Sequence, residues 1–257
     1  ADVIAIDADT SGHITASGVT ALTGTAANVA TVVATDGDSG SNKISLDGDY
    51  TVTLTGAAAA ADVIAIDANT SGHITGTGIT TFTGTAANIA TVVATEADSG
   101  SNKINLDTDF TATVDAGSAS AADLNTIDAA TTGLGTATAV TSLTGTTAEL
   151  ISLINNEGSS GNKVNLDGDF TVTITDAPTD EQLAIIDAAT TGNITIGGGG
   201  GPEGSVTASY LNTLDSNTSG TVDASAVTTI TGTEAAVTSA YAATGIPGIG
   251  NDAIVLT

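Results

Sequence analysis

The feature that most constrains the fold is an internal repeat. Residues 1–60 and 61–120 are near-copies without insertion, since "ADVIAIDADTSGHIT" returns as "ADVIAIDANTSGHIT" and "GTAANVATVVAT" as "GTAANIATVVAT". More diverged copies occupy 121–178 and begin again at 179 and near 205. Repeats of this kind are typical of proteins in which each copy buries its apolar face against its neighbours.

Apolar periodicity predicts helix, strand, helix, strand within each copy. "AADVIAID" and "TGTAANVATVVAT" are the helices, the second with a stripe of Val29, Val32 and Val33 behind a capping Thr25. "KISLDGDYTVTL" alternates apolar and polar residues and predicts one strand, and "HITASGVTALTG" predicts a second, less regular strand.

We therefore expect an α/β repeat fold, a solenoid of about 30-residue coils that each contain one strand and one short helix, two coils per copy. Strands stack about 4.8 Å apart, whereas helices normally need 8–10 Å, so the helices must splay or carry small side chains. The alanines at 26–27, 57–61 and 121–122 fit this requirement. The alternative is a row of independent domains, one per copy.

The repeats also predict how the chain is divided. Residues 1–196 form the regular part. Residues 197–204 ("GGGGGPEG") form a Gly-rich hinge or excursion, and residues 205–257 form the final repeat. Because "NDAIVLT" aligns with the first residues of "NKISLDG", we expect the final repeat to be incomplete at its C-terminus.

The charge excludes several classes of partner. The chain has 29 Asp and Glu residues against 3 Lys and Arg, a net charge of -26. Binding to nucleic acid or to an anionic lipid surface requires basic side chains, so we expect neither nucleic acid nor direct membrane insertion. With two His, no Cys and no recurring acid, base and nucleophile, we also expect no enzyme. Salt screens the repulsion among the carboxylates, so the composition suits salty surroundings or a divalent cation.

The turn "DADTSG" (7–12) spaces its oxygen atoms like the first half of a calcium loop, in which ligands occupy positions 1, 3 and 5 and Gly position 6. The stretch "DGDSG" (36–40) adds a second acidic candidate. The calcium hypothesis names as ligands Asp7, Asp9, Ser11, Asp67, Asn69, Ser71, Asp36 and Asp38.

A structural turn explains the same residues, and we favour it over calcium. Position 12, where the loop needs a bidentate Glu, holds Gly18 or Gly78. Every copy keeps the first Asp and the Gly, namely Asp7, Asp67, Asp128, Asp187 and Asp215 with Gly12, Gly72, Gly133, Gly192 and Gly220. Asp can hold an Asx-type turn, and Gly can adopt the left-handed conformation that ends a helix. An aspartic protease is excluded, because only one copy keeps Asp before Thr.

All three basic residues occupy equivalent positions, each four residues before an acidic one: Lys43, Lys103 and Lys163 before Asp47, Asp107 and Asp167. On a strand, residues i and i+4 lie on the same face. We expect each Lys to offset the repulsion within a stacked column of Asp. The alternative is a carboxylate column that binds cations or basic groups of another chain.

The segments "LTGTAAN", "ADLNTIDAATTG" and "TVDASAVTTITGT" resemble the tandem repeats of very large secreted or cell-surface proteins of marine cyanobacteria and related bacteria. The resemblance implies an extracellular architectural protein with no catalytic residues to transfer. Together with the repetition, it predicts a building block of a cell-surface layer, fibre or filament that binds copies of itself. The alternatives are a calcium-stabilised adhesin module and a Thr-rich strand face that binds ice or a surface polysaccharide.

Overall fold

The computed structural model describes residues 2–36, 44–95, 104–176, 178–196, 205–217, 221–225, 227–250 and 252–257. Several expectations lie outside the described residues: those on Asp38, Lys43, Lys103, Gly220 and the Gly-rich segment 197–204.

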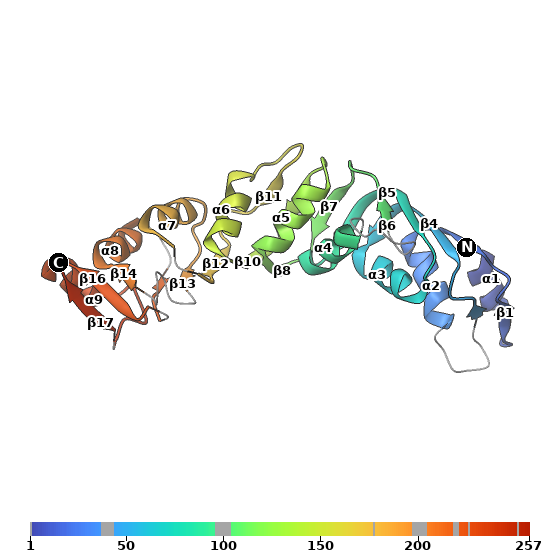
Figure 1. Cartoon of the computed structure of the whole chain (residues 1–257), viewed down its shortest axis with the longest axis horizontal. Helices are drawn as coiled ribbons and strands as arrows, with labels where there is room; N and C mark the ends of the chain where they lie inside the picture. Colours follow the sequence, from blue (N-terminus) through green and yellow to red (C-terminus); the bar gives the residue numbers. More distant parts are fainter. Residues whose placement is uncertain are drawn as a thin grey trace. The chain divides into compact units, whose positions relative to one another are not determined.

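Within the described residues, helices alternate with short strands (Figure 1). The helices are α1 (Asp2–Asp9), α2 (Ala26–Asp36), α3 (Ala60–Asn69), α4 (Ala86–Thr95), α5 (Ala121–Ala130), α6 (Thr147–Asn155), α7 (Asp180–Asp187), α8 (Ala208–Asn217) and α9 (Glu234–Ala242). The strands are β1 (Ile14–Ala16), β2 (Ala21–Gly24), β3 (Ile44–Leu46), β4 (Thr51–Ala59), β5 (Ile74–Gly84), β6 (Ile104–Leu106), β7 (Thr111–Val114), β8 (Gly117–Ser120), β9 (Gly135–Ala137), β10 (Val140–Gly145), β11 (Val164–Leu166), β12 (Thr171–Ile174), β13 (Ile194–Ile196), β14 (Ser205–Thr207), β15 (Val222–Asp223), β16 (Thr229–Gly232) and β17 (Ala253–Leu256).

The chain forms two compact lobes. Lobe 1 comprises Ala1–Asp115, Thr126–Thr136 and Ser159–Lys163, and lobe 2 comprises Ala116–Asn125, Ala137–Gly158 and Val164–Thr257. Each lobe is described by itself.

In lobe 1, β2, β4, β5 and β7 lie side by side in that order and pair in parallel, followed by the first residues of β9. Further parallel pairs join β6 to β5 and β1 to β3. Thr81 on β5 lies opposite Thr111 on β7, 30 residues later in the chain. A helix connects such strands because a parallel connection needs a crossover.

In lobe 2, parallel strands follow the order β8, β10, β12, β13, β15, and a second sheet has the order β14, β16, β17. The expected α/β class is therefore confirmed in both lobes, and the strands pair in parallel.

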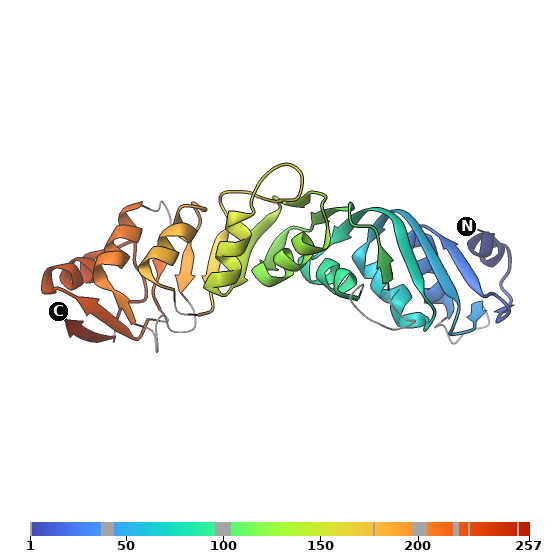
Figure 2. The same cartoon turned by 45° about the horizontal axis from the view of Figure 1, so that its top comes forward.

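The core lies between each sheet and its helices. On β4, Val52 and Leu54 are buried, whereas Thr51 and Thr53 are exposed on the opposite face. Helices α2 and α3 both contact β4, and Figure 2 shows the strands of each lobe side by side with helices beside them. The expected small residues occur where helices begin, since Ala26, Ala60 and Ala121 are fully buried or nearly so. Residues 57–59, however, extend β4 instead of a helix.

Helix starts follow the sequence closely. The Thr25 hydroxyl accepts a hydrogen bond from the Asn28 N–H (3.3 Å), which confirms the expected cap, and Thr85 does the same for Asn88 (3.2 Å). Thr146 forms a full capping box with Glu149. Capping satisfies N–H groups that the first helical turn leaves without partners.

The segment "KISLDGDYTVTL" is not one strand, so that prediction was wrong. Strand β3 ends at Leu46, residues 47–50 form a turn, and β4 begins at Thr51. The reason is local: Asp47 uses its carboxylate to accept the N–H of Gly48 (3.1 Å), a turn-forming bond that competes with strand pairing.

The final strand also differs from its sequence alignment. "NDAIVLT" aligns with the segment that forms β3, but β17 pairs with β16 as β4 pairs with β2: Ile254 lies opposite Ile230, and Val52 lies opposite Leu22. The carbonyls of Gly245 and Pro247 instead accept hydrogen bonds from Val222 and Ala224 on either side of β15. Strand β17 therefore holds the structural place of β4.

Candidate functional site

A recurring hydrogen-bonded turn follows α3, α5 and α7 and anchors the end of each helix to the start of an earlier strand. After α3, the buried Thr70 hydroxyl donates to the carbonyl of Tyr50 (2.5 Å) and accepts from the N–H of Gly72 (3.0 Å). The next residue, Ser71, donates its N–H to the Gly48 carbonyl (2.8 Å). We call this arrangement the latch: a Thr-Ser-Gly or Thr-Thr-Gly turn that follows a helix and donates hydrogen bonds to the carbonyls of residues just before a strand.

The latch recurs with the same geometry. Thr131 donates to the Phe110 carbonyl, and Thr190 donates to the Phe170 carbonyl. Each also accepts from a glycine N–H at 3.0 Å, from Gly133 and Gly192 respectively. This threonine was not among the predicted site residues, although every copy has it, as every copy has the glycine: Thr10, Thr70, Thr131, Thr190 and Thr218.

The persistent glycine is needed for a reason other than the expected one. Gly72, Gly133 and Gly192 do not have the positive φ of a left-handed helix end, so that explanation was wrong. Instead, a Cβ on Gly72 would lie 2.1 Å from the Tyr50 carbonyl oxygen, and one on Gly133 would lie 2.2 Å from that of Phe110. The helix end approaches the strand too closely for any side chain.

The calcium candidates of the first turn and of its copy lie in helices or in the latch. Asp7 and Asp67 lie inside α1 and α3, Asp9 and Asn69 are the last residues of those helices, and Ser71 donates its hydroxyl to Gly48 (3.0 Å). Ser11 follows α1 in the equivalent turn. In the described ranges, no three or more Asp, Glu or His side chains come together as a metal site.

The persistent Asp lies within its helix or at the last helical residue, not in the turn that follows. Asp187 is the last residue of α7, and Asp128 and Asp215 lie within α5 and α8. One carboxylate oxygen of Asp187 is buried and has no hydrogen-bond partner among the described residues. Burial raises the pKa of the Asp187 carboxyl above its ordinary value.

Two calcium candidates, Asp36 and Asn69, meet in a polar network of lobe 1. The Asp36 carboxylate accepts the Leu46 N–H (2.7 Å) and the Asn69 amide N–H (3.3 Å), and the Tyr50 hydroxyl donates to Asn69 Oδ1. Burial, followed by the charge of Asp36, raises the pKa of the Tyr50 hydroxyl to about 12. The network ties α2, β3, α3 and the turn before β4 together.

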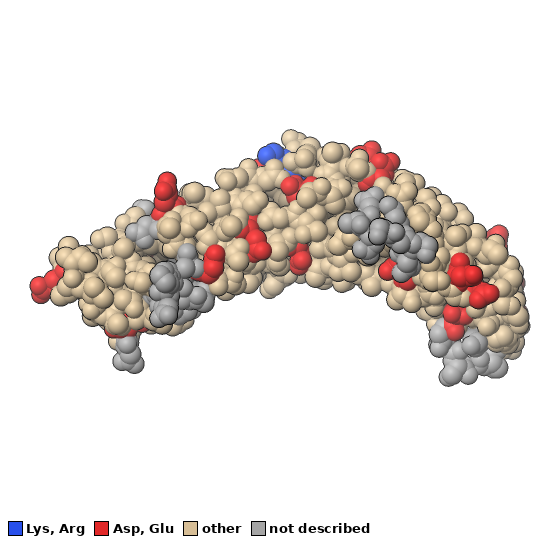
Figure 3. Space-filling view, in the orientation of Figure 1, with Lys and Arg blue, Asp and Glu red and all other residues tan. Residues whose placement is uncertain are grey.

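The predicted column of Lys and Asp pairs is only partly described. Asp47, Asp107 and Asp167 all lie in turns, where their carboxylates accept the N–H of the next residue, Gly48, Thr108 or Gly168, at 2.8–3.1 Å. The premise that Lys and Asp share one strand was therefore wrong, since Lys163 precedes β11 and Asp167 follows it. Figure 3 shows acidic side chains spread over the visible face.

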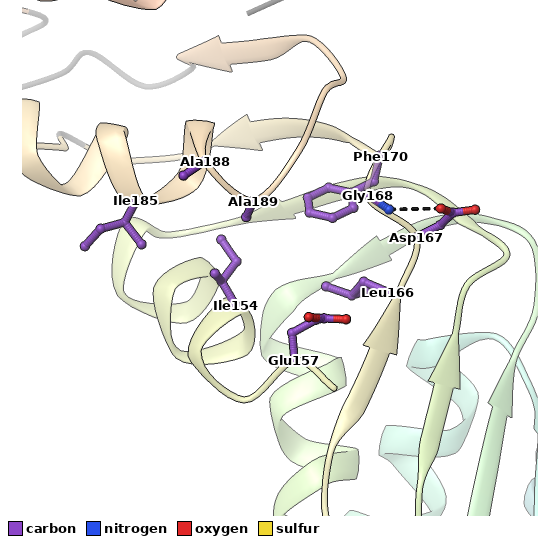
Figure 4. A pocket seen from close by; sticks show the side chains of 9 residues that line it. All are labelled: Ile154, Glu157, Leu166, Asp167, Gly168, Phe170, Ile185, Ala188 and Ala189. Carbon is purple, nitrogen blue, oxygen red and sulfur yellow. Dashed lines mark hydrogen bonds between the residues drawn. The ribbon is translucent and has the colours of Figure 1, made fainter. Parts of the chain in front are cut away.

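Lobe 2 has a pocket of about 330 Å³ beside α6 and α7 (Figure 4). Its wall is mostly apolar, and two carboxylates lie at its edge; the lining residues are Ile154, Glu157, Leu166, Asp167, Gly168, Phe170, Ile185, Ala188 and Ala189. Such a pocket favours a cationic group with an apolar part. It contains no nucleophile with a base beside it, as acyl or phosphoryl transfer would need.

The pocket is the counterpart of the polar network. Aligning "DGDY" with "DGDF" and the two latch turns places Phe170 at the position of Tyr50 and Ala189 at that of Asn69, while Glu157 matches Asp36. The hydroxyl and the amide of lobe 1 are thus missing in lobe 2. The same two replacements occur in lobe 1 at Phe110 and Ala130, so comparing the copies shows where the network is lost but does not by itself locate the pocket.

The two histidines are equivalent in the structure as in the sequence. His13 and His73 each lie beside a Thr hydroxyl two residues later, at 3.4 Å from Thr15 and 3.3 Å from Thr75. His13 is exposed, as expected for a strand-entry residue, and His73 is half-buried.

Among the described residues, none of the helices combines the length and apolar character needed to cross a membrane. No protein-family model, curated protein or solved structure matches the chain.

Proposed function

We propose that this chain is an extracellular structural repeat protein, a building block of a cell-surface layer, fibre or filament. The observation that carries the proposal is the latch. Its buried hydroxyls, close glycines and strand carbonyls recur at Thr70, Thr131 and Thr190, and in each case they join one segment of the chain to another. The polar groups that persist between copies thus hold the fold together and do not form a catalytic site.

The proposal includes a continuous solenoid of about 30-residue coils. Parallel pairing of strands about 30 residues apart supports it. In lobe 1, Thr111 pairs with Thr81, and in lobe 2, Thr171 pairs with Ser142 in the same way. Coils that share a core cannot each bury their apolar face alone.

Isolated copies test the continuous solenoid. Residues 61–120 alone should be unfolded by circular dichroism and amide exchange, because Val63 and Ile66 would lose the neighbours that bury them. Residues 1–257 under the same conditions are the control. A folded, cooperatively melting 61–120 segment would instead support independent domains.

Imaging tests the structural role. Antibody-labelled electron microscopy of the producing cells should place the protein in a regular layer, fibre or filament outside the cell. Label confined to the cell interior, with dispersed molecules in every preparation, would contradict the proposal. The calcium-stabilised alternative needs a melting temperature that falls when a chelator is added.

A further inference from the structure

We infer that copies of this chain join head to tail, with α1 of one copy docking on β17 and α9 of the next as α3 docks on β4 and α2 within the chain. The inference rests on the proposed structural role and names the surfaces that would perform it. Three observations support it: an uncovered strand face, an uncovered helix face and an incomplete latch.

The uncovered strand face is on β17. Ile254 and Leu256 occupy the positions that Val52 and Leu54 hold on β4, because they lie opposite Ile230 and Gly232 as Val52 and Leu54 lie opposite Leu22 and Gly24. Val52 and Leu54 are 1% and 0% exposed, whereas Ile254 and Leu256 are 49% and 60% exposed. On β4, helices α2 and α3 together provide this cover.

The uncovered helix face is on α1. Residues 2–8 of α1 and 62–68 of α3 have the same sequence, "DVIAIDA". Helix α3 buries Val63 and Ile66, but α1 buries no residue, and Ile6, the counterpart of Ile66, is 55% exposed. Since the two sequences agree, the difference in burial comes from the neighbouring elements. Helix α3 contacts α2 and β4, which precede it in the chain. In the proposed junction, α9 and β17 of another copy would take the places of α2 and β4 beside α1.

The latch after α1 is also incomplete, because it lacks the carbonyls of a strand. Thr10 accepts the Gly12 N–H (3.0 Å) as Thr70 accepts that of Gly72, but Thr10 is exposed, and a Cβ on Gly12 would meet only the Thr10 hydroxyl at 3.3 Å. The strand carbonyls that complete the latch at Tyr50 and Gly48 correspond to those of Asp252 and Gly250 before β17. Thr10 and Ser11 of one copy would therefore donate to Asp252 and Gly250 of the next.

One pair of residues departs from the internal template. Asp252 stands where β4 is preceded by Tyr50, and Asp9 stands where α3 ends in Asn69. The junction would therefore bring two carboxylates together in a chain of net charge -26. Association should strengthen as salt rises from about 0.1 M to about 1 M, because the screening length shortens from about 10 Å to about 3 Å. Each head-to-tail contact leaves one head and one tail uncovered, so the product is an open series of oligomers unless the rotation between copies closes a ring.

The test is sedimentation velocity of the 257-residue chain and of two variants, each with one blocked end. Ile6→Asp blocks the head and Leu256→Asp blocks the tail. The unmodified chain should give a series of oligomers at about 1 M salt, and each variant alone should stay monomeric, with association weakened at least about tenfold. An equimolar mixture of the two variants should give dimers and nothing larger, because only one head and one tail remain intact.

Ile185→Asp is the matched control, since it replaces another partly exposed isoleucine and should leave the oligomer series unchanged. Unchanged circular dichroism and melting temperature in all three variants exclude misfolding as the cause of any loss. Oligomers that persist in both blocked variants would overturn the inference but leave the structural role standing. Association of Ile6→Asp alone, with Leu256→Asp monomeric, would mean that β17 pairs with itself and would also overturn it. A strictly monomeric unmodified chain would count against both proposals.

Discussion

At the residue scale, three small groups determine how a helix meets its strand: a threonine hydroxyl, a glycine without Cβ and a main-chain carbonyl. The sequence identified the glycine by its persistence, but the reason is close approach rather than a left-handed turn, and only coordinates reveal a carbonyl that lies 20 residues earlier in the chain. The threonine could have been found by the same persistence.

Gly133→Ala should destabilise the chain by about 2 kcal/mol or more, because the new methyl group would overlap the Phe110 carbonyl oxygen and push the helix end away. Urea unfolding measures the loss. Gly12→Ala is the matched control in the same motif, and its effect should stay below about 0.5 kcal/mol because no strand carbonyl lies nearby. Equal losses in both variants would show that the close approach is unimportant.

The raised pKa of Tyr50 predicts a loss of stability at alkaline pH. Below pH 10, the ordinary tyrosine pKa, the hydroxyl is protonated in both states and its contribution to stability is complete. Between pH 10 and about 12 the unfolded chain releases this proton first, so the free energy of unfolding falls as pH rises, by up to about 2 kcal/mol. Urea unfolding of Tyr50→Phe, which has the residue found at 110 and 170, should lack this component. Parallel pH profiles of the two proteins would contradict the assignment.

At the element scale, helices were predicted better than strands. Val29, Val32 and Val33 form a stripe that only a helix explains, and they are buried as expected. The strand over 43–54 failed because alternation of apolar residues continues across the turn at 47–50, where Asp47 bonds to the backbone. The four-residue β17 carries too little pattern to fix its partner, so its pairing depends on the rest of lobe 2. At the pocket, Phe170 and Ala189 lack the hydroxyl and the amide of Tyr50 and Asn69, a difference visible only between aligned copies.

Helix α6 should depend on a side chain outside it. Asp176 Oδ1 accepts both the N–H (2.7 Å) and the hydroxyl (2.6 Å) of Thr147, which is buried at the start of the helix. Asp176→Ala should cost about 1–3 kcal/mol in thermal or urea unfolding, because a buried donor loses its charged partner.

Asp62→Ala is the control, since Asp62 also lies in a first helical turn but accepts no hydrogen bond from the described residues. Its effect should stay within about 0.5 kcal/mol. If the two substitutions cost the same, the bond from Asp176 would contribute nothing beyond a general helix-end charge.

At the scale of the whole molecule, the repeat predicted the class of fold and the charge predicted its preferred conditions. Repetition predicted strands that alternate with helices, and the structure adds that these strands pair in parallel, as β5 does with β7 and β10 with β12. Threonines also form rows across neighbouring strands: Thr23 lies opposite Thr53, and Thr53 lies opposite Thr75. Because the members of such a row are separated by many residues of sequence, the row is not visible as alternation within one strand.

The melting temperature should rise by at least about 4 °C between about 0.01 M and about 1 M NaCl, because screening relieves repulsion among 29 acidic residues. Differential scanning calorimetry measures the shift. Calcium and magnesium chlorides at matched ionic strength should act alike, since screening does not distinguish them. A rise specific to calcium would favour the calcium-stabilised alternative.

The one-sided burial of the strands divides their residues into two classes with different freedom to change. On β4, β7 and β12, every second side chain enters the core, while its neighbours, mostly threonine, face away from the helices. Saturation mutagenesis should therefore produce a map that alternates residue by residue, intolerant at Val52 and tolerant at Thr53. The tolerant positions form a regular grid whose chemistry can be rewritten, by evolution or by design, without changing the fold beneath it.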